Sequence, residues 1–447
     1  MRIGLIALSG VRVRTEELVA LGVTLPQFVS RGRVVATLPS LGLLTVAALT
    51  PRDVDVVYRE LSEVSADDPL EPFDLVGISS FTAMIDDAYA LADRYRAAGV
   101  PVVLGGLHVS LMPEEAAQHA DSIMLYGAEG AWPRLVDDFR NRRLQPRYVG
   151  LRTGVFESPH YASPRFELLE GRPYNRITVQ TSRGCPHDCE FCAASVRITS
   201  RFQQKPVAAA IAEIERARTL TETPFFELAD DNTFVNAKWG KEFLRALAPL
   251  GVHWFTETDI SVAEDEELLD LLADSGCRQI LIGLESPNAG GLHRIDARNW
   301  KRRHYARYLE AIEAIQSRGV TVNGCFIVGL DNDTPEIFEQ VRDFVVQSRL
   351  LEVQITVPTP FPGTPLYHRL KRQGRLLEDR FWDRCTLFDV NFRPNKMTVE
   401  ELESGLRWLF AEVYNETEFK RRQRQYMDIV KGRRDGRRTA APAVGYA

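Results

Sequence analysis

The segment 176-RITVQTSRGCPHDCEFCAAS-195 lies near the middle of this 447-residue chain and joins a predicted strand to a loop that holds three cysteines. Cys185, Cys189 and Cys192 fall within eight residues, and Gly184 precedes the first of them. Six cysteines in so long a chain are too few for a disulfide scaffold. The trio therefore indicates metal or redox chemistry.

From residue 176 onward the sequence predicts a partial parallel barrel. Short β-rich runs alternate with helical patterns, and active sites of such barrels lie where the strands end. Six strands are expected, at 176–182, 224–230, 252–259, 278–286, 321–329 and 352–359. Helices are expected between them, near 204–219, 237–248, 264–275, 301–318 and 335–348.

The first third of the chain predicts a doubly wound, Rossmann-like domain, because strands, helices and glycine turns repeat in that order. Its strands are expected at 2–8, 53–60, 74–80, 100–106 and 121–127, and its helices at 41–50, at 86–99 and from Pro113.

The expected fold class is thus α/β, with four parts in sequence. The amino-terminal domain spans 1–140, and an Arg-, Pro- and Ser-rich linker spans 141–175. The partial (β/α)6 barrel spans 176–370, and a small helical region, with a helix at 397–416 capped by Thr398, spans 371–447.

Composition narrows the classes of partner. The net charge of −6 argues against nucleic-acid binding, and the basic carboxyl-terminal stretch is interpreted as a solvated helix. No long apolar run and no secretory signal are visible, so a cytoplasmic protein without a membrane segment is expected.

Three thiols on one loop fit an iron–sulfur cluster with an open position. A cubane cluster usually takes four thiolates, so a loop of three leaves one iron free to bind a substrate or cofactor. A zinc site completed by His187, or three unrelated buried cysteines, are the alternatives.

The Cys-x3-Cys-x2-Cys motif, with Phe191 before its last cysteine, resembles that of the radical S-adenosylmethionine superfamily. The resemblance implies a [4Fe–4S] cluster whose free iron binds S-adenosylmethionine, and a 5′-deoxyadenosyl radical that abstracts hydrogen from a substrate. It also implies an external electron donor, such as flavodoxin or ferredoxin.

The resemblance further implies cofactor contacts at several strand ends. By location, Asp230 matches a contact to the methionine amino group, and Glu285 and Ser286 match contacts to the ribose. Gly324 and Gly329 match positions where the backbone approaches the adenosine.

The whole chain is similar to the branch of this superfamily that has an amino-terminal cobalamin-binding-like domain. The similarity rests on the segments 39–51, 74–84, 100–116 and 126–136, and it implies that Ser79, Ser80, Thr82, Gly105 and Gly106 face a corrinoid. An Asp-x-His-x-x-Gly motif is absent, so no histidine is expected to ligate cobalt from below. Cobalamin binding and a retained fold that packs as a lid therefore both stay open.

A cluster of carboxylates favours dehydration as the reaction. The expected strand ends carry Glu227, Asp230, Asp231, Glu257, Asp259 and Glu285, which would suit a small cationic aminosugar. Glu257, Asp259 and Asp231 are the candidate catalytic residues, because a carboxylate beside a carbon radical can assist loss of water. The chain thus resembles the radical dehydratases that deoxygenate aminoglycosides in antibiotic biosynthesis, and a separate reductase would then act on the carbonyl product.

Two other functions are weighed. The first is a cobalamin-dependent radical methyltransferase acting on carbon. The second is a non-catalytic cobalamin or cluster sensor, which is disfavoured because nothing after the barrel resembles an output module.

Overall fold

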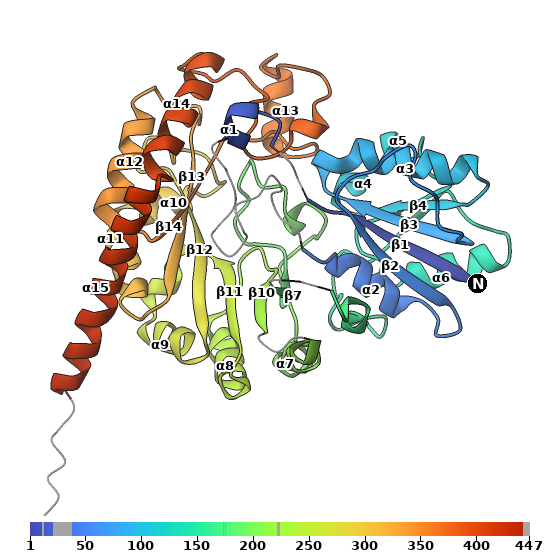
Figure 1. Cartoon of the computed structure of the whole chain (residues 1–447), viewed down its shortest axis with the longest axis horizontal. Coiled ribbons are helices and arrows are strands. Elements are labelled where there is room, and N and C mark those ends of the chain that lie inside the picture. Colours follow the sequence, from blue (N-terminus) through green and yellow to red (C-terminus); the bar gives the residue numbers. More distant parts are fainter. Residues whose placement is uncertain (11–12, 21–37, 173, 175, 221–223, 441–447) are drawn as a thin grey trace, which may run out of the picture. The chain divides into compact units, whose positions relative to one another are not determined.

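The computed structural model describes residues 1–10, 13–20, 38–172, 174, 176–220 and 224–440. The chain forms two compact units (Figure 1). Unit 1 consists of Met1–Val235 and Pro358–Arg393, and unit 2 consists of Asn236–Val357 and Pro394–Ala447. No helix in the described ranges is both long enough and apolar enough to cross a membrane.

Unit 1 contains a six-stranded parallel sheet in the order β2-β1-β3-β4-β5-β6. The change of direction between β1 and β3 is the switch point at which such sheets bind ligands. The doubly wound expectation is confirmed. The strands are β1 (Arg2–Leu8), β2 (Asp55–Leu61), β3 (Leu75–Ser80), β4 (Val102–Gly105), β5 (Ser122–Leu125) and β6 (Arg147–Val149).

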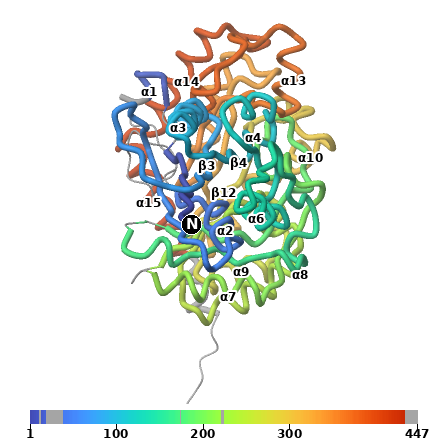
Figure 2. Tube along the Cα trace, turned by 90° about the vertical axis from the view of Figure 1, so that its right-hand side faces the viewer, coloured from blue at the N-terminus to red at the C-terminus, as the bar shows by residue number. Residues whose placement is uncertain are grey.

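Helices cover both faces of this sheet. Figure 1 shows α2 (Leu41–Leu49) and α6 (Trp132–Arg140) on one face, and α3 (Ile85–Ala97), α4 (Leu107–Leu111) and α5 (Pro113–Ala116) on the other. The turned view in Figure 2 shows α3 and α4 beside β3 and β4, in agreement with their contacts. A short helix, α1 (Glu16–Ala20), follows β1.

The expected linker at 141–175 contains regular structure. β6 pairs in parallel with β5, and Phe166 and Leu169 of a 3₁₀ turn are buried. Only Tyr148 of the three β6 residues is buried. A strand with one buried side chain carries too little alternation to be recognised in a sequence.

The second sheet has the order β14-β13-β12-β11-β10-β7. The pairs β7–β10, β11–β12, β12–β13 and β13–β14 are parallel. Strands that follow one another in the sequence are neighbours in this sheet, as is typical of a partial barrel. All six expected barrel strands are present. Unit 1 holds β7 (Ile177–Val179) and β10 (Phe225–Leu228), and unit 2 holds β11 (His253–Thr258), β12 (Cys277–Glu285), β13 (Thr321–Ile327) and β14 (Glu352–Thr356).

The helices of the barrel also follow the expected order. The helix predicted near 397–416 is α14 (Val399–Val413), and Thr398 caps it through a capping box, as predicted. Unit 1 contains α7 (Val207–Ala217) and α13 (Pro365–Arg372). Unit 2 contains α8 (Ala237–Leu247), α9 (Glu266–Asp274), α10 (Trp300–His304), α11 (Tyr308–Gln316), α12 (Ile337–Ser348), α14 (Val399–Val413) and α15 (Glu416–Ala440).

The segment 358–393 packs into the core of the first domain. Tyr367, Phe381, Trp382 and Cys385 belong to one buried cluster with residues of β3, β4 and α3. The buried carboxylate of Asp389 accepts hydrogen bonds from the backbone N–H groups of Arg14 and Thr15, at 3.0 and 2.8 Å. Unit 1 is therefore built from two separate stretches of chain.

Candidate functional site

The cysteine loop is framed by a small antiparallel pair, β8 (Ser182–Arg183) and β9 (Gln203–Gln204). The loop begins at Gly184, which has a φ of +85° and whose N–H donates to Ser195 Oγ at 2.7 Å. A Cβ at this position would lie 2.9 Å from Thr199 Oγ1 and 3.2 Å from the carbonyl oxygen of Arg201. Glycine is therefore required where the chain enters the loop.

Arg197 holds the backbone of the loop. Its guanidinium donates to the carbonyl oxygens of Cys192 and Cys189, at 2.7 and 2.8 Å, and to Asp188 Oδ1 at 2.9 Å. The N–H of Cys192 also donates to the carbonyl oxygen of Cys189 at 3.1 Å. Two of the three predicted ligands are thus fixed through their backbone by an arginine that the sequence did not single out.

The three thiols suit an iron–sulfur cluster by their chemistry. Cys189 is buried, and Cys185 and Cys192 are half-buried. Burial raises the pKa of Cys192 to about 11. Within the described residues, no three His, Cys, Asp or Glu side chains are gathered closely enough to hold a metal ion. Three soft sulfur donors on one short, braced loop nevertheless match the ligand set of such clusters, so ligation by these cysteines stays a prediction.

Asp230 and Asp231 hold the chain around the loop. Asp230 is buried and accepts hydrogen bonds from the N–H groups of Thr181 and Ser182, at 2.7 and 2.8 Å. Asp231 accepts from Ser195 Oγ at 2.7 Å. Both carboxylates therefore have partners in the protein itself, and their predicted contacts with cofactor and substrate stay predictions.

Another loop residue, Glu190, is braced from α13. Arg369 donates to both of its carboxylate oxygens, at 2.9 and 2.6 Å. Phe191, which follows it, is half-buried. Glu227, on β10, forms an ion pair with Arg176 at 2.5 Å, and both side chains are largely buried.

In unit 2, Glu285 ends β12 in an unusual backbone conformation. Its φ is +66°, and the register with β13 shifts between Gly283 and Glu285. Lys301 Nζ lies 2.8 Å from Glu285 Oε1 and donates to the carbonyl oxygen of Gly283 at 2.6 Å. Strained backbone that the surroundings maintain is often found at functional sites, and the ribose contact of Glu285 stays a prediction.

The other predicted residues of unit 2 have clear structural environments. Ser286 is fully buried. A Cβ on Gly324 would meet Leu350 at 2.6 Å, so packing accounts for that glycine. Gly329 has a φ of +96°. Asp259 caps the following turn by accepting from the N–H of Ser261 at 2.9 Å. The sixth strand-end carboxylate, Glu257, is exposed.

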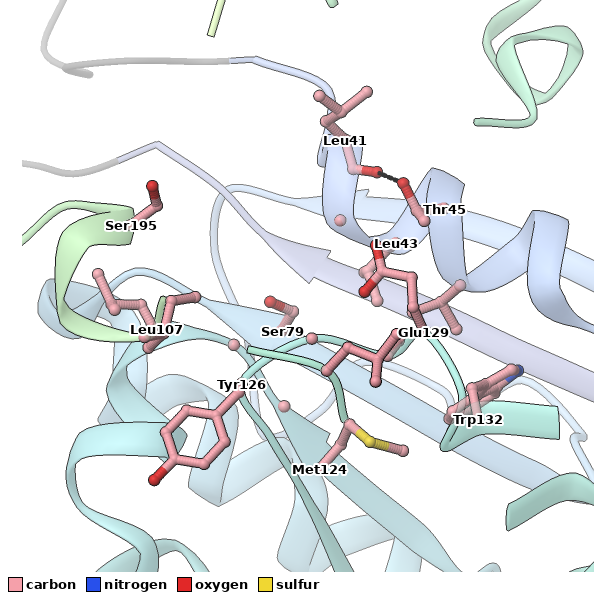
Figure 3. Close-up of a pocket in the computed structure, with 18 of the residues that line it drawn as sticks. Leu41, Leu43, Thr45, Ser79, Leu107, Met124, Tyr126, Glu129, Trp132 and Ser195 are labelled. Atoms are coloured by element: carbon pink, nitrogen blue, oxygen red, sulfur yellow. Dashed lines mark hydrogen bonds between the residues drawn. The ribbon is translucent and has the colours of Figure 1, made fainter. Parts of the chain in front are cut away.

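A pocket in unit 1 lies at the carboxyl ends of the first sheet. Figure 3 shows Leu41, Leu43 and Thr45 of α2 above Ser79, Met124 and Tyr126 from the strand ends. The cavity volume is about 320 Å³, within the range typical of small-molecule sites. Of the residues expected to face a corrinoid, Ser79, Gly105 and Gly106 line this pocket.

The second wall of the pocket comes from the frame of the cysteine loop. Gln180, Arg183, Ser195, Ile198 and Thr199 all line it. One cavity is therefore shared between the Rossmann-like sheet and the loop that carries the predicted cluster.

An ion pair joins these two walls. Glu129, only 1% exposed, lies 2.8 Å from Arg183 Nη2, and Arg183 Nε donates to Gln180 Oε1 at 2.7 Å. The sequence gives no signal for this pair, because its members lie 54 residues apart.

The pocket has open space beside two of its lining glycines, Gly42 and Gly105. A Cβ on Gly42 would meet no atom within 4 Å, and one on Gly105 would meet only Met124, at 3.5 Å or more. No histidine is among the described lining residues. His108 is buried and turned to other partners, with Nδ1 3.3 Å from Thr82 Oγ1 and Nε2 3.7 Å from Glu115. The residues present thus fit a corrinoid that takes no histidine ligand from this face.

Comparison with protein families matches three regions of the chain. Residues 179–345 match the radical SAM superfamily, and residues 29–136 match the B12 binding domain. Residues 364–444 match a domain of unknown function, DUF4070.

The curated relatives include methyltransferases. Bacteriochlorophyllide d C-12(1)-methyltransferase of Chlorobaculum tepidum is 27% identical over 84% of this chain and 82% of its own length. Hopanoid C-2 methylase of Rhodopseudomonas palustris is 28% identical over 77% of this chain and 67% of its own length.

A solved structure shares the fold. The radical S-adenosylmethionine methyltransferase TsrM from Kitasatospora setae, with cobalamin and a [4Fe–4S] cluster bound, superposes with a TM-score of 0.64 at 14% identity. The match covers 97% of this chain and 99% of that one.

The expected dehydration of an aminosugar is wrong. The relatives named above are methyltransferases or methylases, which supports the alternative of methyl transfer and leaves a lyase reaction and antibiotic biosynthesis without support. The structure also weakens the case for dehydration, because groups of the protein itself engage the strand-end carboxylates Glu227, Asp230, Asp231, Asp259 and Glu285.

Proposed function

Since this chain is a radical SAM enzyme with an amino-terminal B12-binding domain, we propose that it is a cobalamin-dependent methyltransferase that transfers a methyl group from S-adenosylmethionine to a small molecule. Its cofactors are a [4Fe–4S] cluster, S-adenosylmethionine and cobalamin, and its reaction needs a reductant. We propose flavodoxin or ferredoxin for that role. When bound, the cluster with S-adenosylmethionine supplies a radical and the corrinoid supplies a methyl carrier.

The shared pocket of unit 1 carries this proposal. A methyl carrier must lie close to the site where S-adenosylmethionine binds, and the pocket is lined both by the strand ends of the B12-binding domain and by residues flanking the three cysteines. Glu129 and Arg183 fix the two walls to each other. Gly42 and Gly105 border open space in this pocket, which a bound corrinoid would fill.

The residues have distinct roles in the proposal. Cys185, Cys189 and Cys192 hold the cluster, and Arg197 keeps their loop in shape. Gly42 and Gly105 leave room for the corrinoid, and the pocket walls exclude water from it.

Replacing Gly42 with leucine tests the proposal. The full-length protein is produced anaerobically with cobalamin supplied, is desalted, and its corrinoid content per chain is measured from the visible spectrum. The leucine side chain should fill open space in the pocket and lower corrinoid content by about tenfold or more, the equivalent of at least ~1.4 kcal/mol in binding. Iron content and the thermal stability of the corrinoid-free protein should stay unchanged, because nothing beyond the helix's own backbone and the chain neighbours lies within 4 Å of the new Cβ.

Gly432→Leu is the matched control. Gly432 also lies in a helix, and its Cβ would also meet no atom within 4 Å, but it lies outside the pocket. This variant should retain corrinoid. A wild-type protein that keeps no corrinoid would overturn the proposed function, and a Gly42→Leu protein with full corrinoid content would place the corrinoid elsewhere.

A further inference from the structure

The sheet in unit 2 has two chemically different faces. One face carries Ile282, Leu284 and Phe326, which are buried. Phe344 of α12 packs on Phe326 with ring centroids 5.6 Å apart, and Tyr308 Oη of α11 donates to the carbonyl oxygen of Leu284 at 3.0 Å. Helices therefore cover the apolar face.

The opposite face carries polar side chains on three adjacent strands. In the parallel register, Gln279 of β12 pairs with Thr321 of β13, two residues before Asn323. Asn323 pairs with Glu352 of β14, two residues before Gln354. Paired residues, and residues two apart on a strand, point to the same side of a sheet. Gln279, Asn323 and Gln354 therefore share the face that α11 and α12 do not cover.

Polar atoms of these amides are buried without hydrogen-bond partners in the described chain. Asn323 is fully buried, and neither its Oδ1 nor its Nδ2 has a partner. Gln279 is 1% exposed and its Oε1 has no partner, and the same holds for the buried Oε1 of Gln354. Native proteins pair the large majority of such groups, and each exception calls for an explanation.

Packing does not explain these residues. Barrel interiors are normally filled by branched apolar side chains, which would fit here without any polar cost. The thiol of Cys325, on the same face, is neutral, because burial and then the charges of Glu285 and Glu257 raise its pKa. The three amides and this thiol are thus neutral groups, with both donors and acceptors, on a face that also carries Glu352.

We propose that Gln279, Asn323 and Gln354 form a subsite for uncharged hydrogen-bonding groups, such as hydroxyls or carboxamides, of the bound substrate. The identification of the occupant as the methyl acceptor rests on the proposed function. The observation that these amides are unpaired does not depend on it. A carboxamide or hydroxyl both donates and accepts, so it satisfies the amides without placing a charge in a buried site.

The first test measures the thermal stability of the reconstituted holoenzyme without substrate. Asn323→Leu and Gln279→Met remove unpaired polar atoms, so their Tm should be unchanged or higher by ~2–4 °C. Gln316→Met is the matched control. Gln316 is also fully buried, but its Nε2 donates to the carbonyl oxygen of Arg349 at 3.0 Å and its Oε1 accepts from Leu351 N at 3.3 Å. The control should have a lower Tm, and an equal loss in Asn323→Leu would overturn the subsite.

The second test soaks holoenzyme crystals with acetamide, an uncharged amide of side-chain size. Acetamide should bind within hydrogen-bond distance of Asn323 in the wild type and be absent from the Asn323→Leu crystals. Ordered water alone at these amides, unmoved by acetamide, would contradict the proposal. Neither readout depends on corrinoid retention or methyl transfer, so failure of the subsite and failure of the proposed function are distinguishable.

Discussion

Asp333 is a carboxylic acid that the fold keeps away from water. Its side chain is 3% exposed, and its Oδ2 accepts the N–H groups of Gly329 and Leu330, at 3.0 and 2.9 Å. Burial raises its pKa to about 7, although these two N–H groups and Lys396 oppose the change and Asp331 adds to it. The folded protein therefore binds a proton at Asp333 more tightly than the unfolded chain, whose aspartate pKa is about 3.9.

Because of this difference in pKa, the free energy of unfolding should decrease as pH rises. Because the folded pKa is raised, the stabilisation is complete below about pH 4 and is lost as pH rises through about 7. Asp333→Asn cannot ionise, so its Tm should fall less than that of the wild type between pH 5 and pH 8. Thermal unfolding across that range measures the difference, and parallel curves for the two proteins would contradict the expectation.

At the scale of elements, a long amphipathic pattern with a cap signal was enough to predict structure. The sequence predicted both the helix near 397–416 and its cap, Thr398. The sequence did not predict β6, because a strand with one buried residue shows no clear alternation. It also did not predict the Glu129–Arg183 pair, because two charges 54 residues apart form no local sequence pattern. Likewise, a strand-end carboxylate has the same appearance in a sequence whether it binds a ligand, as expected for Asp231, or another part of the chain.

The cap of α14 gives a second prediction. Thr398 Oγ1 accepts from the N–H of Glu401 at 3.1 Å, and Glu401 Oε2 accepts from the N–H of Thr398 at 2.7 Å. Thr398→Ala should lower the free energy of unfolding by about 1 kcal/mol, as loss of an N-cap usually does. Glu401→Gln is the control, because glutamine also completes a capping box. Chemical denaturation of both variants measures the effect, and a Thr398→Ala protein as stable as the wild type would contradict the expectation.

At the scale of the whole molecule, unit 1 depends on a segment that is distant in the sequence. Trp382 is 2% exposed and belongs to the core cluster that includes β3, β4 and α3. Its Nε1 donates to Glu115 at 3.1 Å. Arg380, two residues earlier, forms an ion pair with Asp86 of α3. The pocket and the cysteine loop lie in the unit that this segment completes.

Trp382→Ala should therefore destabilise unit 1 strongly. Truncation of a buried tryptophan typically costs about 3–5 kcal/mol. Trp408→Ala is the control, because Trp408 is 36% exposed on α14 in unit 2. Calorimetry should show a much larger fall in Tm for Trp382→Ala, together with loss of bound corrinoid. A small fall would mean that the amino-terminal domain is stable without this segment.

The split composition of unit 1 also affects how the protein is made. Domains usually fold in order, the amino-terminal one first, while the ribosome synthesises the chain at about 5–20 residues per second. Here the amino-terminal core waits for Tyr367, Phe381 and Trp382, which are synthesised after the whole second sheet. The nascent first domain thus exposes apolar surface through most of translation, and a ribosome that stalls before residue 382 releases a product whose first domain lacks part of its core.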